Sequence, residues 1–119
     1  MLMMRSWLLA LAVALAGCGV AIAGSGPTPK QFGFALQAAG SCSALQMRVD
    51  TENKVNSGRS LPIRDGDGYQ DGLFYVMDHP DTACQEAWER FGCSGSEAKG
   101  LLQHSSKMGA SRRLCEYQG

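Results

Sequence analysis

Residues 81–93 read DTACQEAWERFGC and hold two of the five cysteines of the chain. Pro80 stands just before this stretch, where it disfavours helix upstream, and Asp81 suits the positive end of a helix dipole. Gly92 is a residue at which helices commonly end. The stretch therefore predicts a helix over 81–91. Its apolar residues recur at the i, i+3, i+4, i+7 spacing of one helix face: Cys84, Ala87, Trp88 and Phe91.

This helix restricts how the cysteines pair. Cys84 and Cys93 would lie roughly 12–14 Å apart at about 1.5 Å per residue, whereas a disulfide needs Cα atoms within about 7 Å. The two are therefore predicted not to bond to each other, and each should pair with Cys42 or Cys115. We expect Cys84 to pair with Cys115 and Cys42 with Cys93, because antiparallel packing of two C-terminal helices would return the chain end towards Cys84.

The N-terminus has the layout of an export signal. A short charged segment with Arg5 precedes an apolar run over 7–16 and then small residues. Residues 15–18, LAGC, resemble the lipobox at which bacteria lipidate a cysteine. We therefore predict a signal peptide over 1–17 and a lipidated Cys18, which makes the protein a lipid-anchored (palmitate-bearing) lipoprotein. Because no aspartate follows this cysteine, the resemblance implies that the lipoprotein is anchored in the outer membrane.

Two alternatives to the lipid anchor remain. The A-x-A site at 21–23 would end a signal peptide at 1–23 and release a periplasmic or secreted protein. An uncleaved membrane helix over 7–23 would lie at the lower length limit for a span. In the main interpretation, residues 18–29 are a flexible tether, and 30–119 form one small globular domain that disulfides help to stabilise.

The charges are balanced in number but uneven along the chain. There are 11 basic and 11 acidic residues, and this balance argues against a nucleic-acid partner, which requires a basic face. A run of acidic residues without any Lys or Arg is followed by a basic C-terminus with Lys107, Arg112 and Arg113. We interpret the two as a solvated acidic face that touches a basic tail. The acidic residues are Asp65, Asp67, Asp71, Asp78, Asp81, Glu86 and Glu89.

Other patterns indicate a mixed fold. Thr28 and Pro29 are suited to begin a helix that Gly40 would end. Residues 45–49 alternate between apolar and polar, which narrowly favours a strand over a helix. Residues 51–72 are polar and glycine-rich, as in a long loop or irregular hairpin. The β-prone run LFYVM at 73–77 predicts a strand.

The sequence predicts less regular structure in the C-terminal part of the chain. Ser94 and Glu97 match a capping box before a weak helix that would contain Leu101 and Leu102. Residues 114–117 are expected as an edge strand or as a tail held by its disulfide. The predicted fold class is a small disulfide-linked α+β domain, and the alternative is an all-α disulfide-linked bundle.

One segment has the composition of a metal site. Asp65, Asp67 and Asp71 stand in DGDGYQD, which resembles the D-x-D-G-x-x-D pattern of calcium loops, and calcium prefers several oxygen ligands. The EF-hand register fails, since Phe74 would occupy the position of the bidentate glutamate. A turn is therefore the preferred interpretation of the segment, and a weak calcium site is the alternative.

The sequence points to binding rather than catalysis. No Ser/His/Asp arrangement, paired carboxylates or phosphate-binding glycine loop stands out, so we expect no enzyme and no cofactor. Residues 83–91, ACQEAWERF, resemble a segment of small conjugation entry-exclusion proteins, and that resemblance implies a conjugation surface protein. The main prediction is a cell-envelope interaction lipoprotein, held to the membrane by its lipid, with a protein partner. Neither the identity of that partner nor the oligomeric state follows from the sequence.

Overall fold

Residues 26–119 are described in a computed structural model of the protein. The predictions for the signal peptide, the A-x-A site and Cys18 lie outside these residues. The helices are α2 (Pro29–Ser41), α3 (Thr51–Asn56), α4 (Tyr69–Asp78) and α5 (Ala83–Phe91), the strands are β1 (Leu45–Gln46) and β2 (Gln103–His104), and the 3₁₀ segments are η2 (Ile63–Asp65) and η3 (Ser106–Ser111).

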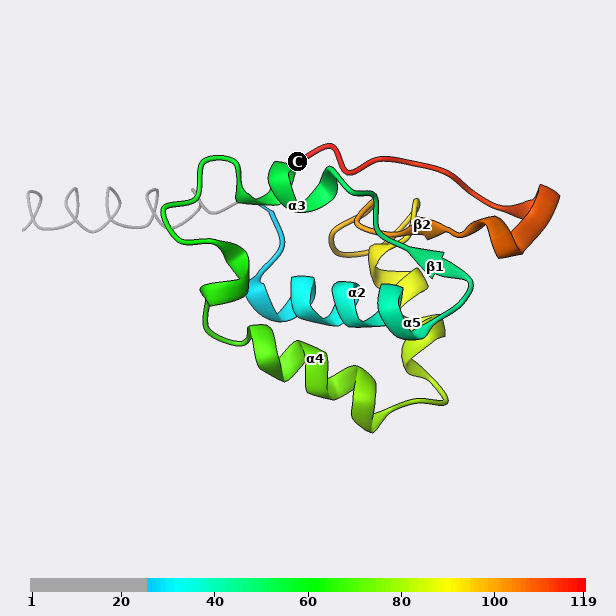
Figure 1. Cartoon of the computed structure of the whole chain (residues 1–119), viewed down its shortest axis with the longest axis horizontal. Coiled ribbons are helices and arrows are strands. Elements are labelled where there is room, and N and C mark those ends of the chain that lie inside the picture. Colours follow the sequence, from blue (N-terminus) through cyan, green and yellow to red (C-terminus); the bar gives the residue numbers. More distant parts are fainter. Residues whose placement is uncertain (1–25) are drawn as a thin grey trace, which may run out of the picture.

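Helix α2 lies at the centre of the domain and begins at its predicted cap (Figure 1). The Gln31 backbone N–H donates to the Thr28 hydroxyl at 3.1 Å, and the Thr28 N–H donates to the Gln31 side chain at 2.9 Å. This reciprocal pair satisfies two otherwise unpaired donors of the first turn. The helix passes Gly40 and ends at Ser41, one residue beyond the expected stop.

Helix α4 runs alongside α2 and corrects the strand prediction for 73–77 (Figure 1). A Cβ placed on Gly72 would lie 2.1 Å from the Lys30 carbonyl oxygen, and one on Gly33 would lie 2.2 Å from the Tyr69 carbonyl oxygen. The two helices therefore touch backbone to backbone through their glycines. This packing overrides the β preference of the side chains, because local propensity is weaker than tertiary contact.

Helix α5 has the predicted apolar stripe only in part, because Cys84 is exposed and Ala83 is buried in its place. Ala83, Ala87 and Phe91 are buried, and the Phe91 ring meets the Phe34 ring of α2 edge-on at 5.4 Å between centroids. The helix ends before Gly92, as expected. The core that these helices enclose also takes in apolar residues from the segments that follow them. Its fully buried large apolar side chains are Phe32, Ile63, Phe91, Leu101 and Leu102.

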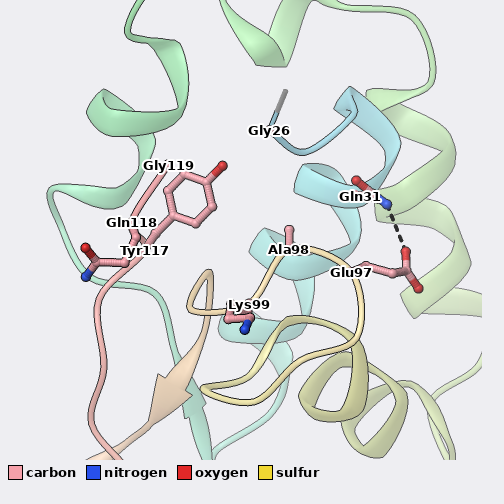
Figure 2. Close-up of a pocket in the computed structure, with 8 residues that line it drawn as sticks. All are labelled: Gly26, Gln31, Glu97, Ala98, Lys99, Tyr117, Gln118 and Gly119. Atoms are coloured by element: carbon pink, nitrogen blue, oxygen red, sulfur yellow. Dashed lines mark hydrogen bonds between the residues drawn. The ribbon is translucent and has the colours of Figure 1, made fainter. Parts of the chain in front are cut away.

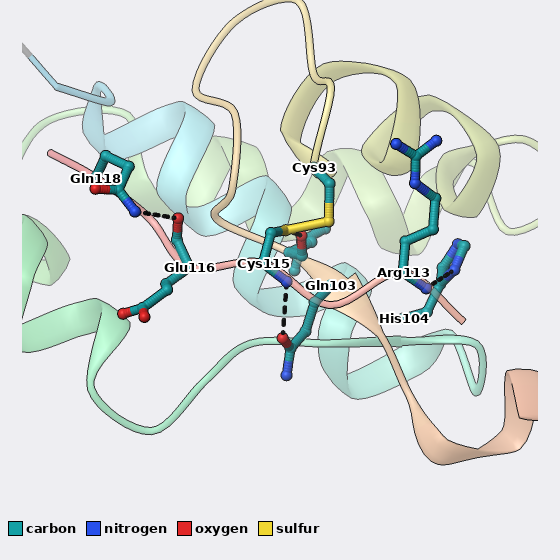
Figure 3. The surroundings of a disulfide bond; sticks show 8 residues. Cys93, Gln103, His104, Arg113, Cys115, Glu116 and Gln118 are labelled. Carbon is teal, nitrogen blue, oxygen red and sulfur yellow. Dashed lines mark hydrogen bonds between the residues drawn. A yellow bond between two sulfur atoms is a disulfide. The ribbon is translucent and has the colours of Figure 1, made fainter. Parts of the chain in front are cut away.

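The disulfides are Cys42–Cys84 and Cys93–Cys115, with Cα–Cα distances of 5.8 and 5.7 Å. Figure 3 shows the second of them. The prediction that Cys84 and Cys93 do not bond to each other is confirmed, whereas the expected pairing of Cys84 with Cys115 and of Cys42 with Cys93 is wrong. That pairing assumed a second C-terminal helix.

The chain after α5 turns back instead of forming that helix. The Gly100 N–H donates to the Gly92 carbonyl at 2.8 Å, and the Leu102 N–H donates to the Phe91 carbonyl at 2.9 Å. Gly100 has a positive φ of 86°, which breaks the helical pattern. The predicted capping-box helix is therefore absent.

The remaining elements are short. Strands β1 and β2 pair antiparallel, with Leu45 opposite His104, so the strand expected over 45–49 covers only two residues. The loop expected over 51–72 contains α3 and η2, and the C-terminal tail is held by its disulfide without forming a strand. The result is a small disulfide-linked domain, largely helical, with a much smaller sheet than the α+β prediction implied.

Candidate functional site

The acidic loop of the predicted calcium site lies between η2 and α4. Asp65, Asp67 and Asp71 are all exposed, and the loop lines a surface hollow of about 430 Å³. Within residues 26–119, no three His, Cys, Asp or Glu side chains are grouped as metal ligands. The calcium interpretation therefore stays a prediction.

The glycines of this loop have a packing role. A Cβ on Gly66 would lie 2.4 Å from the Pro29 ring, and Gly68 has a φ of 93° with Lys30 beside it. Asp71 lies in the first turn of α4, where a carboxylate stabilises the positive end of the helix dipole. Close packing of the loop against the start of α2 is thus sufficient reason for the glycines. The turn that we preferred is present, but it leads into a helix and not a strand.

A polar network around Arg90 is the feature that the sequence did not predict. The Arg90 guanidinium donates to both oxygens of Glu97, with Nη2 2.8 Å from Oε1, and it lies 4.9 Å above the Phe34 ring. The Gln31 amide donates to the same carboxylate at 2.8 Å. On the other side, the Tyr75 hydroxyl donates to Glu86 at 2.8 and 3.0 Å.

The network alters the acidity of its members. The hydrogen bond from Arg90 lowers the pKa of Glu97, and the hydrogen bond to Glu86 raises the pKa of Tyr75. No buried side-chain nitrogen or oxygen among the described residues lacks a hydrogen-bond partner. These groups are therefore engaged with one another. They link α2, α4, α5 and the turn at Glu97, which is a structural role.

Two histidines lie near aromatic rings. His79 stacks on Tyr75 with centroids 4.0 Å apart, and its Nδ1 is 2.8 Å from the Tyr75 carbonyl oxygen. His104 stacks on Trp88 at 3.8 Å, and its Nδ1 accepts from the Arg113 N–H at 2.9 Å. Both rings are used in packing and backbone contacts, so neither is arranged as the base of a nucleophile.

The pocket in Figure 2 has a volume of about 340 Å³ and lies where the described chain begins and ends. A Cβ placed on Gly26 would lie 3.4 Å from the Tyr117 hydroxyl oxygen there, and the Gln31–Glu97 hydrogen bond closes one side. The lining contains no histidine, cysteine or serine, and its titratable side chains are Glu97, Lys99 and Tyr117. The residues that line it are Gly26, Gln31, Glu97, Ala98, Lys99, Tyr117, Gln118 and Gly119.

The outer face of α4 is the most distinctive surface. The helix buries Gly72 and Val76 against α2, so the opposite side chains point to solvent. Phe74 is 52% exposed and Met77 is 61% exposed. Asp71 and Asp78 flank them at helical spacing and are exposed. We call these four residues, Asp71, Phe74, Met77 and Asp78, the α4 ridge.

The basic C-terminal residues are not paired with the acidic residues of this region. Within residues 26–119, Lys107, Arg112 and Arg113 form no ion pair. Leu114 beside them is 57% exposed. No ion pair therefore joins the acidic face to the basic tail, and their contact stays a prediction. We call Lys107, Arg112, Arg113 and Leu114 the basic arm. The arm lies around η3, which Figure 1 shows at the end of the domain away from α4.

Comparison with known proteins adds no relative. No family model, no curated protein and no solved structure matches the chain. The resemblance of residues 83–91 to entry-exclusion proteins stays a prediction, and Ala83, Ala87 and Phe91 of that segment are core residues here. Among the described residues, no helix has the length and apolar character to cross a membrane.

Proposed function

We propose that the protein is a cell-envelope lipoprotein whose domain binds a protein partner and performs no catalysis. The observation that carries the proposal is the α4 ridge. Two large apolar side chains, Phe74 and Met77, stand exposed between carboxylates on a helix whose other side packs against α2. Exposed aromatic and methionine side chains next to one another are typical of protein contact surfaces.

The compartment agrees with this proposal. Two disulfides link the domain, and such bonds persist outside the cytoplasm. The protein is therefore extracytoplasmic. In the proposal, Cys18 bears the lipid and the chain reaches the domain at Gly26. Positions 18 and 26 are eight residues apart, so the tether extends at most roughly 26–29 Å. The domain would then remain close to the outer membrane.

The polar side chains support binding over chemistry. Arg90, Glu97 and Tyr75 are engaged in one network, and both histidines contact backbone and aromatic groups. The aspartates of the acidic loop are exposed rather than gathered in a cleft. In the pocket of Figure 2, the Glu97 carboxylate accepts hydrogen bonds from Gln31 and Arg90, which engages it in structure.

The anchor is tested by mass spectrometry of the mature N-terminus. We expect a diacylglyceryl-modified Cys18 and fractionation with the outer membrane, both lost in Cys18→Ser. A free N-terminus at Gly24 would contradict the anchor, and so would unchanged membrane fractionation of the Cys18→Ser protein.

The binding surface is tested by cross-linking in intact cells. We expect the wild type to cross-link to a defined envelope protein, and the Phe74→Ser/Met77→Ser variant to lose that product. Val49→Ser is the matched control, because Val49 is 99% exposed but lies on another part of the domain. Equal cross-linking by all three proteins, or none by the wild type, would contradict the proposal.

A further inference from the structure

The α4 ridge and the basic arm are complementary surfaces on one chain. From Asp65 to Glu89 there are seven acidic residues and no Lys or Arg, whereas residues 98–115 contain four basic residues and no Asp or Glu. Each surface also exposes apolar groups: Phe74 and Met77 on the ridge, and Leu114 on the arm. Opposite charge around an apolar centre is the usual composition of two surfaces that bind each other.

The arm is held in a defined position. The Ser105 hydroxyl donates to the Ser43 carbonyl at 2.5 Å, and the Ser105 N–H donates to the Ala44 carbonyl at 2.9 Å. The far end is fixed by the exchange between His104 and Arg113, in which the His104 N–H donates to the Arg113 carbonyl at 2.9 Å (Figure 3). The Cys93–Cys115 disulfide follows directly. A segment fixed at both ends loses little conformational entropy on binding.

The two surfaces do not meet within one molecule. None of the ion pairs of residues 26–119 joins the arm to α4 or to the acidic loop. In Figure 1 the arm projects at one end of the domain while α4 forms one side. Because the charges of the arm form no ion pair within residues 26–119, they are available to a second molecule.

We propose that the α4 ridge of one molecule binds the basic arm of a second copy of this chain, in a head-to-tail contact. Arg112 and Arg113 would pair with Asp71 and Asp78, and Leu114 would pack on Phe74 and Met77. Such a contact leaves one ridge and one arm free at its two ends, so it continues into a short chain or closes into a ring. This inference rests on the proposed function only in taking the ridge as a binding surface.

The contact is expected to be weak in solution. It joins two small patches, so its Kd should be about 10⁻⁴ M or higher. Molecules anchored in the same membrane experience a much higher effective concentration than free molecules do. Head-to-tail association is therefore expected mainly at the membrane surface, with the purified domain reporting it only at high concentration.

The test is sedimentation equilibrium of the exported domain without its lipid. Residues 26–119 contain a buried core of their own, so residues 19–119 are suitable. We expect the mean mass to rise with concentration in about 10 mM salt and to return to that of the monomer in about 1 M salt, because the screening length falls from roughly 30 Å to about 3 Å.

Charge reversal identifies the two surfaces. We expect Asp71→Lys/Asp78→Lys and Arg112→Glu/Arg113→Glu each to remain monomeric alone, and an equimolar mixture of the two to associate, because each variant then meets an oppositely charged surface. Arg59→Glu/Lys99→Glu is the control, since it changes the net charge as much as the arm variant does. Both residues are exposed and belong to neither the α4 ridge nor the basic arm, so this variant should associate like the wild type.

Three results would overturn the inference: a wild type that stays monomeric at millimolar concentration, variants that associate as the wild type does, or a mixture that stays monomeric. If the domain stays monomeric while cellular cross-linking to another protein still requires Phe74 and Met77, this inference fails and the proposed function stands. If cross-linking yields only the protein's own dimer through these residues, the second copy is the partner.

Discussion

Helices α4 and α5 are neighbours in the chain and both pack against α2, but they do so in opposite ways. Helix α5 contacts the core with apolar side chains, Ala87 and Phe91 among them, and its outer face is polar. Helix α4 contacts α2 backbone to backbone through Gly72 and by the Tyr75 ring against Phe34, and it leaves Phe74 and Met77 outside. Where a glycine makes part of the contact, the apolar residues of a helix therefore do not all lie on its buried face.

The two helices should differ most in the free energy of unfolding that is lost when an aromatic residue is truncated. Phe91→Ala should lower the free energy of unfolding by about 3–5 kcal/mol, because it removes a fully buried ring. Phe74→Ala should change it by less than about 0.5 kcal/mol, since that ring is half exposed. Urea unfolding followed by circular dichroism measures both, and comparable losses in the two variants would mean that the α4 ridge is part of the core.

Replacing a glycine by alanine should change the free energy of unfolding by a smaller amount. Gly72→Ala should cost about 1–3 kcal/mol, because the new Cβ would meet the Lys30 and Phe34 backbone. Gly40→Ala in α2 is the control: nothing lies within 4 Å of its Cβ position, so it should stabilise the domain by about 0.5–1 kcal/mol. The melting temperature reports both changes, and a Gly72→Ala protein as stable as Gly40→Ala would exclude the close helix contact.

The contrast between α4 and α5 also explains which parts of the fold can be predicted from the sequence. The α2 start, the α5 stripe and the exclusion of a Cys84–Cys93 bond follow from local patterns, since caps and helical periodicity act over a few residues. The position of α4 does not, because a glycine contributes nothing to a hydrophobic pattern and LFYVM is β-prone. Cysteine pairing depends on how the chain after Gly92 turns back, which residues far apart in the sequence determine.

The candidate surfaces, too, can be predicted from the sequence only in part. The segregation of charge between 65–89 and the C-terminus is visible in the sequence. That Lys107, Arg112 and Arg113 make no ion pair with the acidic stretch, and that Phe74 and Met77 face outward, depends on tertiary structure. The Arg90–Glu97 pair is equally hidden, because the sequence places Glu97 in a capping box whose helix does not form.

The smallest expected change in stability comes from the Arg90–Glu97 ion pair. This pair supports α5 and has no counterpart on the outer face of α4. The pKa of Glu97 is lowered by its hydrogen bond from Arg90. Its contribution is therefore complete above the ordinary value of 4.5 and is lost as the pH falls through the lower pKa of the folded state. Both side chains are about a third exposed, so the contribution should be about 1 kcal/mol or less.

Glu97→Gln tests this contribution. Urea unfolding at about pH 7 and about pH 3 should show a smaller pH-dependent loss in the variant than in the wild type, with the variant less stable at neutral pH. An identical pH dependence in both proteins would contradict the account.

The central claim is that residues 69–78 form a helix whose glycine face lies against α2 and whose ridge faces solvent. NMR spectroscopy of the labelled domain tests it most directly. We predict helical Cα chemical shifts over 69–78 and nuclear Overhauser contacts from Gly72 to Lys30 and Gly33. Extended-strand shifts over 73–77, with cross-strand contacts in place of those to α2, would contradict the claim and, with it, the ridge as a binding surface.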